Sequence, residues 1–317
     1  MKCHEAVRCF VVDGRSLVNG LQFAVREFRR ERGFFVFAWK EIMALPQSEL
    51  RRYEHEGFVP AIDVMSAEEA FQLRQNLESF EAQQGGKLEA SQRSRAFLLF
   101  PWLDNLIRDP RVLDPIEQLI GPNILCWSTI FWIKEAGSKS FVDWHQDNTY
   151  WGLSSRRVVT AWFAISDASE EAGCMSVIPG THLGNTLEHE DTYDPDNMLT
   201  RGQRIRQLDS DRAVAMPLHA GQMSVHNYCL AHGSGPNLSA DRRIGVSMHF
   251  LPPDARQTVA NWDCAALVRG VDESGHFAHT PRPRFEMDPL TVEFHQRAST
   301  ALREILYSGA AQKPARL

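Results

Sequence analysis

The sequence predicts a mainly β fold with flanking helices, in which short strands form a sandwich or a barrel. Two observations support this prediction. After Gly121, short runs of apolar and β-branched residues alternate with Gly, Pro and polar turns, as in all-β layer structures. Before Gly121, helix signals predominate. The strands expected in the β region are residues 124–133, 158–165, 175–178, 213–216, 222–225 and 242–250.

In addition to a short helix at residues 48–53, one strand and three helices are expected before the β region. Residues 58–64 are typical of a short strand. Ser66 followed by Glu69 is the signature of a capping box, which predicts a helix over residues 66–77. The remaining helices are expected at residues 97–107 and 112–120, with a closing helix at 289–307 near the end of the chain.

The first 42 residues differ from the rest, because a charge run at 26–33 is followed by an isolated apolar patch at 34–39. One hypothesis is that residues 1–42 are an N-terminal extension that is dispensable for folding. The alternative is a packed helix over residues 17–30. Residues 43–317 would then form a single domain, which a polar insertion at about 183–212 interrupts. Long polar insertions beside a site are usually lids or disordered loops.

Composition narrows the class of protein. Of the 317 residues, 43% are hydrophobic and 23% are charged, as is ordinary for a globular protein. A net charge of -6 argues against a nucleic-acid partner. No apolar run has the length of a membrane span, and no signal peptide is evident, so we expect a cytoplasmic protein with no membrane partner. The six cysteines have no zinc spacing and fit free thiols in a reducing compartment.

A metal site is indicated by His145 and Asp147, which lie two residues apart in a segment with the pattern of an extended strand. Side chains two apart on a strand point to the same face, so both could reach one cation. The third ligand is expected to be His232, which lies in a Gly/Ser/Pro/Asn-rich turn. Two histidines and a carboxylate, with open positions, are typical of non-haem Fe(II) oxygenases. The other histidines considered as ligands, and judged more typical of core or surface positions, are His182, His219, His226 and His249.

Arg243 follows His232 by eleven residues and is the candidate for binding a cosubstrate carboxylate. A guanidinium grips a carboxylate through two hydrogen bonds of fixed orientation. In the expected strand, one face carries apolar residues at 244, 246, 248 and 250, and the other carries Arg243 with small and polar residues. The second face suits a ligand cavity. Arg242 is expected at the surface.

These motifs resemble the phytanoyl-CoA dioxygenase family of Fe(II)/2-oxoglutarate-dependent oxygenases. The resemblance covers roughly residues 49–251 and rests on His145-Gln-Asp147, on residues 173–182 (GCMSVIPGTH) and on residues 232–239 (HGSGPNLS) with Arg243. It implies a double-stranded β-helix core, also called a jelly-roll or cupin-like core. In that core His145, Asp147 and His232 would bind iron, Arg243 would bind the distal carboxylate of 2-oxoglutarate, Ser234 would assist, and Trp162 would line the cosubstrate pocket.

The resemblance also implies a reaction. Related halogenases have a small residue where this chain has Asp147, so the carboxylate favours hydroxylation over halogenation. We expect a dioxygenase that uses Fe(II), 2-oxoglutarate and O2 to hydroxylate a small molecule, with release of succinate and CO2. The substrate would be a polar metabolite or natural-product intermediate, and the basic run at 201–206 suggests an anionic one. The alternatives are a non-catalytic jelly-roll binding protein and a cupin-type isomerase or hydrolase. Trp144, Tyr150 and Trp151 are candidates for the substrate wall, with core packing as the alternative. Lys134 is a candidate for an extra charge near the pocket, with an exposed position as the alternative.

Overall fold

The computed structural model describes residues 15–18, 21–24 and 44–312. The chain forms two units, Met1–Trp39 and Lys40–Leu317. In the first unit, β1 (Arg15–Val18) pairs with β2 (Leu21–Ala24) in antiparallel fashion. The alternative of a helix over residues 17–30 is therefore wrong for the described part of that segment. The boundary expected after residue 42 lies outside the described residues, and dispensability of residues 1–42 stays a prediction.

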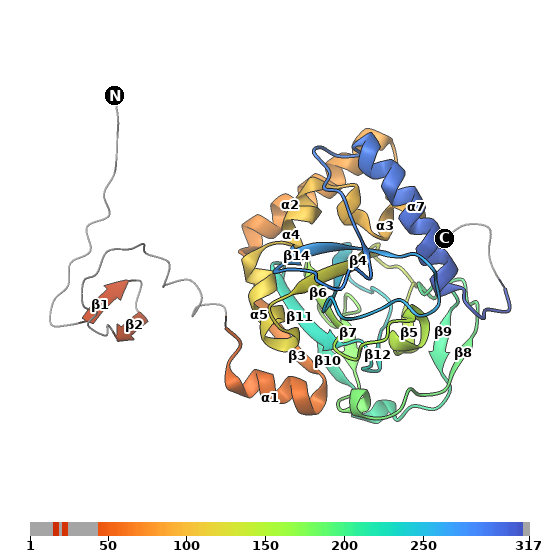
Figure 1. Ribbon diagram of the computed structural model, residues 1–317. Coiled ribbons are helices and arrows are strands. Elements are labelled where there is room, and N and C mark those ends of the chain that lie inside the picture. Colours follow the sequence, from red (N-terminus) through yellow and green to blue (C-terminus); the bar gives the residue numbers. More distant parts are fainter. Residues whose placement is uncertain (1–14, 19–20, 25–43, 313–317) are drawn as a thin grey trace. The chain divides into compact units, whose positions relative to one another are not determined.

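The second unit has a jelly-roll core of two sheets, which confirms the predicted fold class (Figure 1). A seven-stranded and a four-stranded sheet share a cluster of buried side chains that includes Trp162, Ala164, Val177 and Met216. The larger sheet has the order β15 (Ala278–His279), β14 (Cys264–Arg269), β4 (Ile124–Lys134), β13 (Arg243–Leu251), β6 (Val159–Ala164), β11 (Gln222–Asn227), β3 (Phe58–Asp63). The smaller sheet has the order β10 (Val214–Met216), β7 (Met175–Val177), β12 (His232–Ser234), β5 (Val142–His145).

Helices cover the outer face of the larger sheet (Figure 1). Ser66 caps the longest of the early helices and forms the predicted capping box with Glu69. The helix expected at 97–107 is instead a 3-10 turn followed by a short helix, because Pro101 begins a new helix at its first position. The helical elements of this unit are α1 (Gln47–Glu56), α2 (Ala67–Gln84), α3 (Ala90–Arg93), η1 (Ala96–Leu98), α4 (Pro101–Leu106), α5 (Pro110–Ile120), α6 (Asn148–Trp151), η2 (Thr181–Leu183), η3 (Ser210–Arg212) and α7 (Pro289–Leu306).

Strand β13 lies at the centre of the larger sheet, between β4 and β6. Its apolar face packs in the main core beneath the helices, through Ile244, Val246, Met248 and Phe250. Its other face lines an internal cavity through Arg243, Ser247 and His249. The strand phase inferred from the sequence is confirmed, and it decides which side of the sheet receives the arginine. Arg242 lies outside the cavity, in an ion-pair network with Glu81 and Glu135. Its side chain is only 10% exposed, so it is less open to solvent than the expected surface position implies.

The polar insertion at 183–212 contains an antiparallel hairpin, β8 (His189–Asp191) with β9 (Gln203–Ile205), and β9 contacts β5 (Figure 1). Three arginines of its basic run form ion pairs with acidic residues of the same hairpin: Arg201 with Asp191, Arg204 with Glu190, and Arg206 with Glu188. The charge of this run is thus largely compensated within the insertion. It is not a free anion-binding patch.

Among the described residues, no helix combines the length and the apolar character that a membrane span requires. Cys126, Cys174, Cys229 and Cys264 are buried free thiols.

Candidate active site

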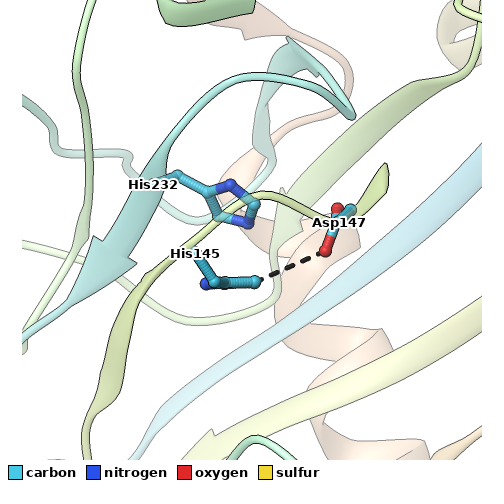
Figure 2. Close-up of side chains that lie close together, drawn as sticks. All are labelled: His145, Asp147 and His232. Carbon is cyan, nitrogen blue, oxygen red and sulfur yellow. Dashed lines mark ion pairs between the residues drawn. The ribbon is translucent and has the colours of Figure 1, made fainter. Parts of the chain in front are cut away.

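The three predicted metal ligands lie together (Figure 2). His145 ends β5 and His232 begins β12, and the two are paired across the antiparallel ladder. Their ring centroids are 4.1 Å apart. Asp147 Oδ1 lies 3.4 Å from His145 Nε2. One ligand atom from each of the three residues lies within 4.8 Å of the others, so a single ion could contact all three.

The alternation of side chains along a strand, which predicted that Asp147 would lie on the same face as His145, is not what brings the two together. Strand β5 ends at His145, and Asp147 has helical angles (φ -61°, ψ -35°) immediately before α6. The bend between strand and helix, and not the alternation of side chains along a strand, turns the carboxylate back toward His145. The His145-Gln146-Asp147 sequence indicates which two residues are ligands, but it does not indicate this change of backbone direction.

Both imidazoles are oriented by their backbone neighbours. His145 Nδ1 lies 2.9 Å from the Asp143 carbonyl, and His232 Nδ1 lies 2.9 Å from the Leu230 carbonyl. Because a carbonyl only accepts, each Nδ1 carries the hydrogen, and each Nε2 keeps its lone pair for a metal.

Burial sets the charge state of the three side chains, which are between 3% and 8% exposed. It lowers the pKa of His145 and of His232 to about 4, so both are neutral at neutral pH. It raises the pKa of Asp147 to about 6, because the ionised carboxylate loses its hydration on burial. Two neutral imidazoles and one carboxylate out of water are a donor set that a divalent cation fits, and three protein ligands leave positions open for other ligands.

Arg243 is a buried cation in the same cavity. Its Nη1 donates to the Gly173 carbonyl (2.7 Å), and its guanidinium carbon lies 5.2 Å from the Trp162 ring centroid. Within the described part of the chain it forms no ion pair, and its Nε has no hydrogen-bond partner. Burial lowers its pKa to about 10, so it stays charged at neutral pH. An unpaired buried charge is costly, which points to an anionic ligand as its partner.

Ser234 and Trp162, the two other residues expected at the cosubstrate site, also line the cavity. Lys134 donates to Ser234 Oγ (2.7 Å) and to the Gly235 carbonyl. Lys134 thus holds the Ser234 hydroxyl in place at the cavity wall. Burial, assisted by the charge of Arg243, lowers the pKa of Lys134 to about 6.

Trp162 can lie across the sheet because position 245 is glycine. A Cβ at Gly245 would be 2.0 Å from Trp162 Cζ2, well inside contact distance. Gly245 follows Arg243 by two residues on the same face of β13. The absence of a side chain at 245 therefore lets the indole lie beside the guanidinium.

The cavity has a volume of about 490 Å³ and is lined by the ligand triad, Arg243 and part of the insertion. His226, Thr160 and His249 stand opposite one another on β11, β6 and β13, and all three line it. Each has a buried polar atom without a hydrogen-bond partner among the residues described. A row of such atoms suits a polar ligand or ordered water.

Arg93, at the end of α3, also lines the cavity and was not predicted. It is half-buried, its Nε has no partner, and no described residue forms an ion pair with it. Burial lowers its pKa. Its local sequence carries no motif, and only the packing of α3 against β4 brings it to the cavity.

The remaining candidates divide between cavity and core. Tyr150 and Trp151 line the cavity. Trp144 instead packs against Ile178, Ile205 and Ala231, which is the core-packing alternative. His226 lies with its ring 4.5 Å from that of His232 but is not part of the metal-binding set found among the described residues.

Comparisons with known proteins identify a family and several relatives. The family model for phytanoyl-CoA dioxygenase (PhyH) matches residues 53–245. A probable alpha-ketoglutarate-dependent hypophosphite dioxygenase of Stutzerimonas stutzeri is 27% identical over 198 residues, which cover 62% of this chain and 66% of that protein. Human peroxisomal phytanoyl-CoA dioxygenase is 31% identical over 150 residues, which cover 46% of this chain and 44% of that enzyme. The match thus spans just under two thirds of the first relative and less than half of the second.

Among solved structures, the non-heme monooxygenase ThoJ in its apo form is 31% identical, with a TM-score of 0.71. The match covers 81% of this chain and 96% of ThoJ. CytC3 is 23% identical with a TM-score of 0.57 and shares the fold.

Proposed function

The chain belongs to the phytanoyl-CoA dioxygenase (PhyH) family of Fe(II)- and 2-oxoglutarate-dependent dioxygenases, and from that premise we propose that it hydroxylates a small anionic molecule. One observation carries the proposal. A buried His/Asp/His set and an unpaired buried arginine line the same cavity.

In this proposal His145, Asp147 and His232 hold Fe(II) through two Nε2 atoms and a carboxylate oxygen. Bound Fe(II), with 2-oxoglutarate and O2, supplies the oxidising chemistry, and succinate and CO2 are released. The distal carboxylate of 2-oxoglutarate is held by the fork of Arg243 and by the Ser234 hydroxyl. Trp162 forms the wall beside that carboxylate and limits the access of water to it.

The anionic character of the substrate is proposed from Arg93. This second cation lines the cavity with no described ion-pair partner, and Arg243 is assigned to the cosubstrate. A carboxylate or a phosphorus oxyanion matches a guanidinium well. The S. stutzeri relative is named for an oxyanion, hypophosphite.

Hydroxylation is proposed over halogenation because Asp147 is a carboxylate that points toward the two imidazoles. Its oxygen would fill the metal position that a halide needs. The wall contributed by Tyr150, Trp151 and the insertion would orient the substrate and exclude bulk water.

The test is conversion of 2-oxoglutarate to succinate by the purified protein supplied with Fe(II). We expect turnover in the wild type and its loss in Asp147→Ala, because two imidazoles alone would hold the metal weakly. His219→Ala is the matched control, since that side chain is 87% exposed and does not line the cavity. Undiminished turnover in Asp147→Ala would refute the ligand assignment, and metal binding without any succinate would favour the non-catalytic binding protein.

A further inference from the structure

Gln146, the residue between two of the triad members, is a buried bridge. Its side chain is directed into the protein, where Nε2 donates to the Cys229 carbonyl (2.6 Å). Its Oε1 accepts from the Leu187 N–H (2.7 Å). Cys229 lies three residues before His232, and Leu187 belongs to the insertion. One amide therefore joins the segment that carries His145 and Asp147 to the segment leading to His232 and to the insertion.

The insertion makes a second contact with the same segment. His189, the first residue of β8, has its Nδ1 2.7 Å from the Leu187 carbonyl. That carbonyl can only accept, so Nδ1 carries the hydrogen and Nε2 is an acceptor. The backbone N–H of Gln146 donates to this Nε2 (3.0 Å). The insertion thus holds both the side chain and the backbone of the residue that separates His145 from Asp147.

The same insertion faces the ligand cavity. Residues 195–200 and Gln203 line it, and Tyr150, which follows the ligand segment, contacts the ring of His189 (5.5 Å between centroids). A molecule bound in the cavity would meet the insertion on one side and the metal-binding residues on the other.

We propose that Gln146 and His189 are positioning residues that couple the insertion to the metal site. The insertion holds the bend between β5 and α6 in the arrangement that brings Asp147 to the imidazoles. Because coupling between two sites is reciprocal, metal binding in turn stabilises the insertion. This inference rests on the proposed function only in taking the triad as a metal site.

The first test measures the affinity for Ni(II) alone by calorimetry. Partners that orient ligand residues typically contribute about 10- to 100-fold to metal affinity, and we expect losses of that size in His189→Phe and Gln146→Met. His189→Gln should restore most of the affinity, because its amide oxygen can accept the Gln146 N–H. Glu188→Ala is the matched control, since it breaks an exposed ion pair beside His189 but makes no contact with Gln146.

Thermal unfolding of each metal-free variant separates positioning from general stability. A merely structural role would lower the melting temperature and leave the affinity of the folded protein for Ni(II) unchanged, which would overturn the proposal. Wild-type affinity in both His189→Phe and Gln146→Met would also overturn it. A wild-type protein that binds no Ni(II) would instead contradict the proposed function itself.

The second test needs no variant. Hydrogen exchange of the wild-type backbone amides at Gln146, Leu187 and residues 189–191 should slow when Ni(II) is added. The control is the loop at Asp254, which is ion-paired with Arg157 and whose amide exchange should slow less. Equal exchange at the insertion with and without bound Ni(II) would contradict the coupling.

Discussion

Arg243 lies on the face of β13 that lines the cavity. On the alternating strand its neighbours at 244 and 246 are apolar and buried, so the arginine must face the opposite side, where the cavity lies. The buried guanidinium then has a carbonyl and an aromatic face as neighbours but no described carboxylate. Its charge is compensated only when an anion enters the cavity.

Arg243→Lys should raise the KM for 2-oxoglutarate by about 10- to 100-fold, the factor expected for losing a hydrogen bond to a charged group. Lysine keeps the charge but cannot offer two parallel donors. Steady-state succinate formation with varied 2-oxoglutarate measures the effect. Arg242→Lys, at the neighbouring position but in the outer ion-pair network, should leave the KM unchanged. Equal KM values in the two variants would remove Arg243 from the cosubstrate site.

At the scale of elements, the site depends on how β6 and β13 lie against each other. Ser247 pairs with Trp162 across the ladder, and the indole extends over Gly245 toward Arg243. The two strands thereby place an aromatic wall beside a cation. A side chain at position 245 would disturb this arrangement without touching the metal ligands.

Gly245→Ala should displace the Trp162 indole, because the new Cβ would lie 2.0 Å from its ring. We expect a loss of about 1–3 kcal/mol in the free energy of unfolding, as for other overpacked core positions. The KM for 2-oxoglutarate should rise as well. Urea unfolding and kinetics measure both effects. Adding Trp162→Phe should recover part of the stability, and a double variant no more stable than Gly245→Ala would show that the clash is not the cause.

Parts of these elements could be predicted from the sequence and others could not. His145, His232 and Arg243 stand in motifs with local spacing, and the strand phase follows from the alternation of apolar residues. The bend at Asp147 depends on where β5 stops, which its neighbours in sequence do not specify. Arg93 and His189 reach the site through long-range packing of α3 and of the insertion, so no local pattern marks them.

At the scale of the whole molecule, a set of buried histidines makes stability depend on pH. Burial lowers the pKa of His145 and His232 to about 4 and that of His249 to about 3, from an ordinary 6.5. Burial also places the pKa of His226 well below 6.5. In each case the unfolded chain takes up a proton at a higher pH than the folded protein. Asp147 has the opposite effect, because its raised pKa lets the folded protein take up a proton at a higher pH than the unfolded chain does.

The free energy of unfolding of the metal-free protein should therefore fall as the pH is lowered from about 6.5 toward 4, since four histidines outweigh one carboxyl group. Urea denaturation at a series of pH values measures the slope. His249→Phe should make the slope shallower by about one proton, because the ring can still pack on Trp151 but no longer titrates. An unchanged slope in that variant would show that His249 does not contribute.

Binding of 2-oxoglutarate without oxygen tests most directly the claim that the triad and Arg243 form one site. Calorimetry would compare metal-free protein, Fe(II)-loaded protein and Fe(II)-loaded Arg243→Met protein. We predict tight binding of one equivalent only when both Fe(II) and Arg243 are present, because the metal and the guanidinium would hold opposite ends of the same dianion. Equal affinity for 2-oxoglutarate in all three samples would contradict a single site formed by the triad and Arg243.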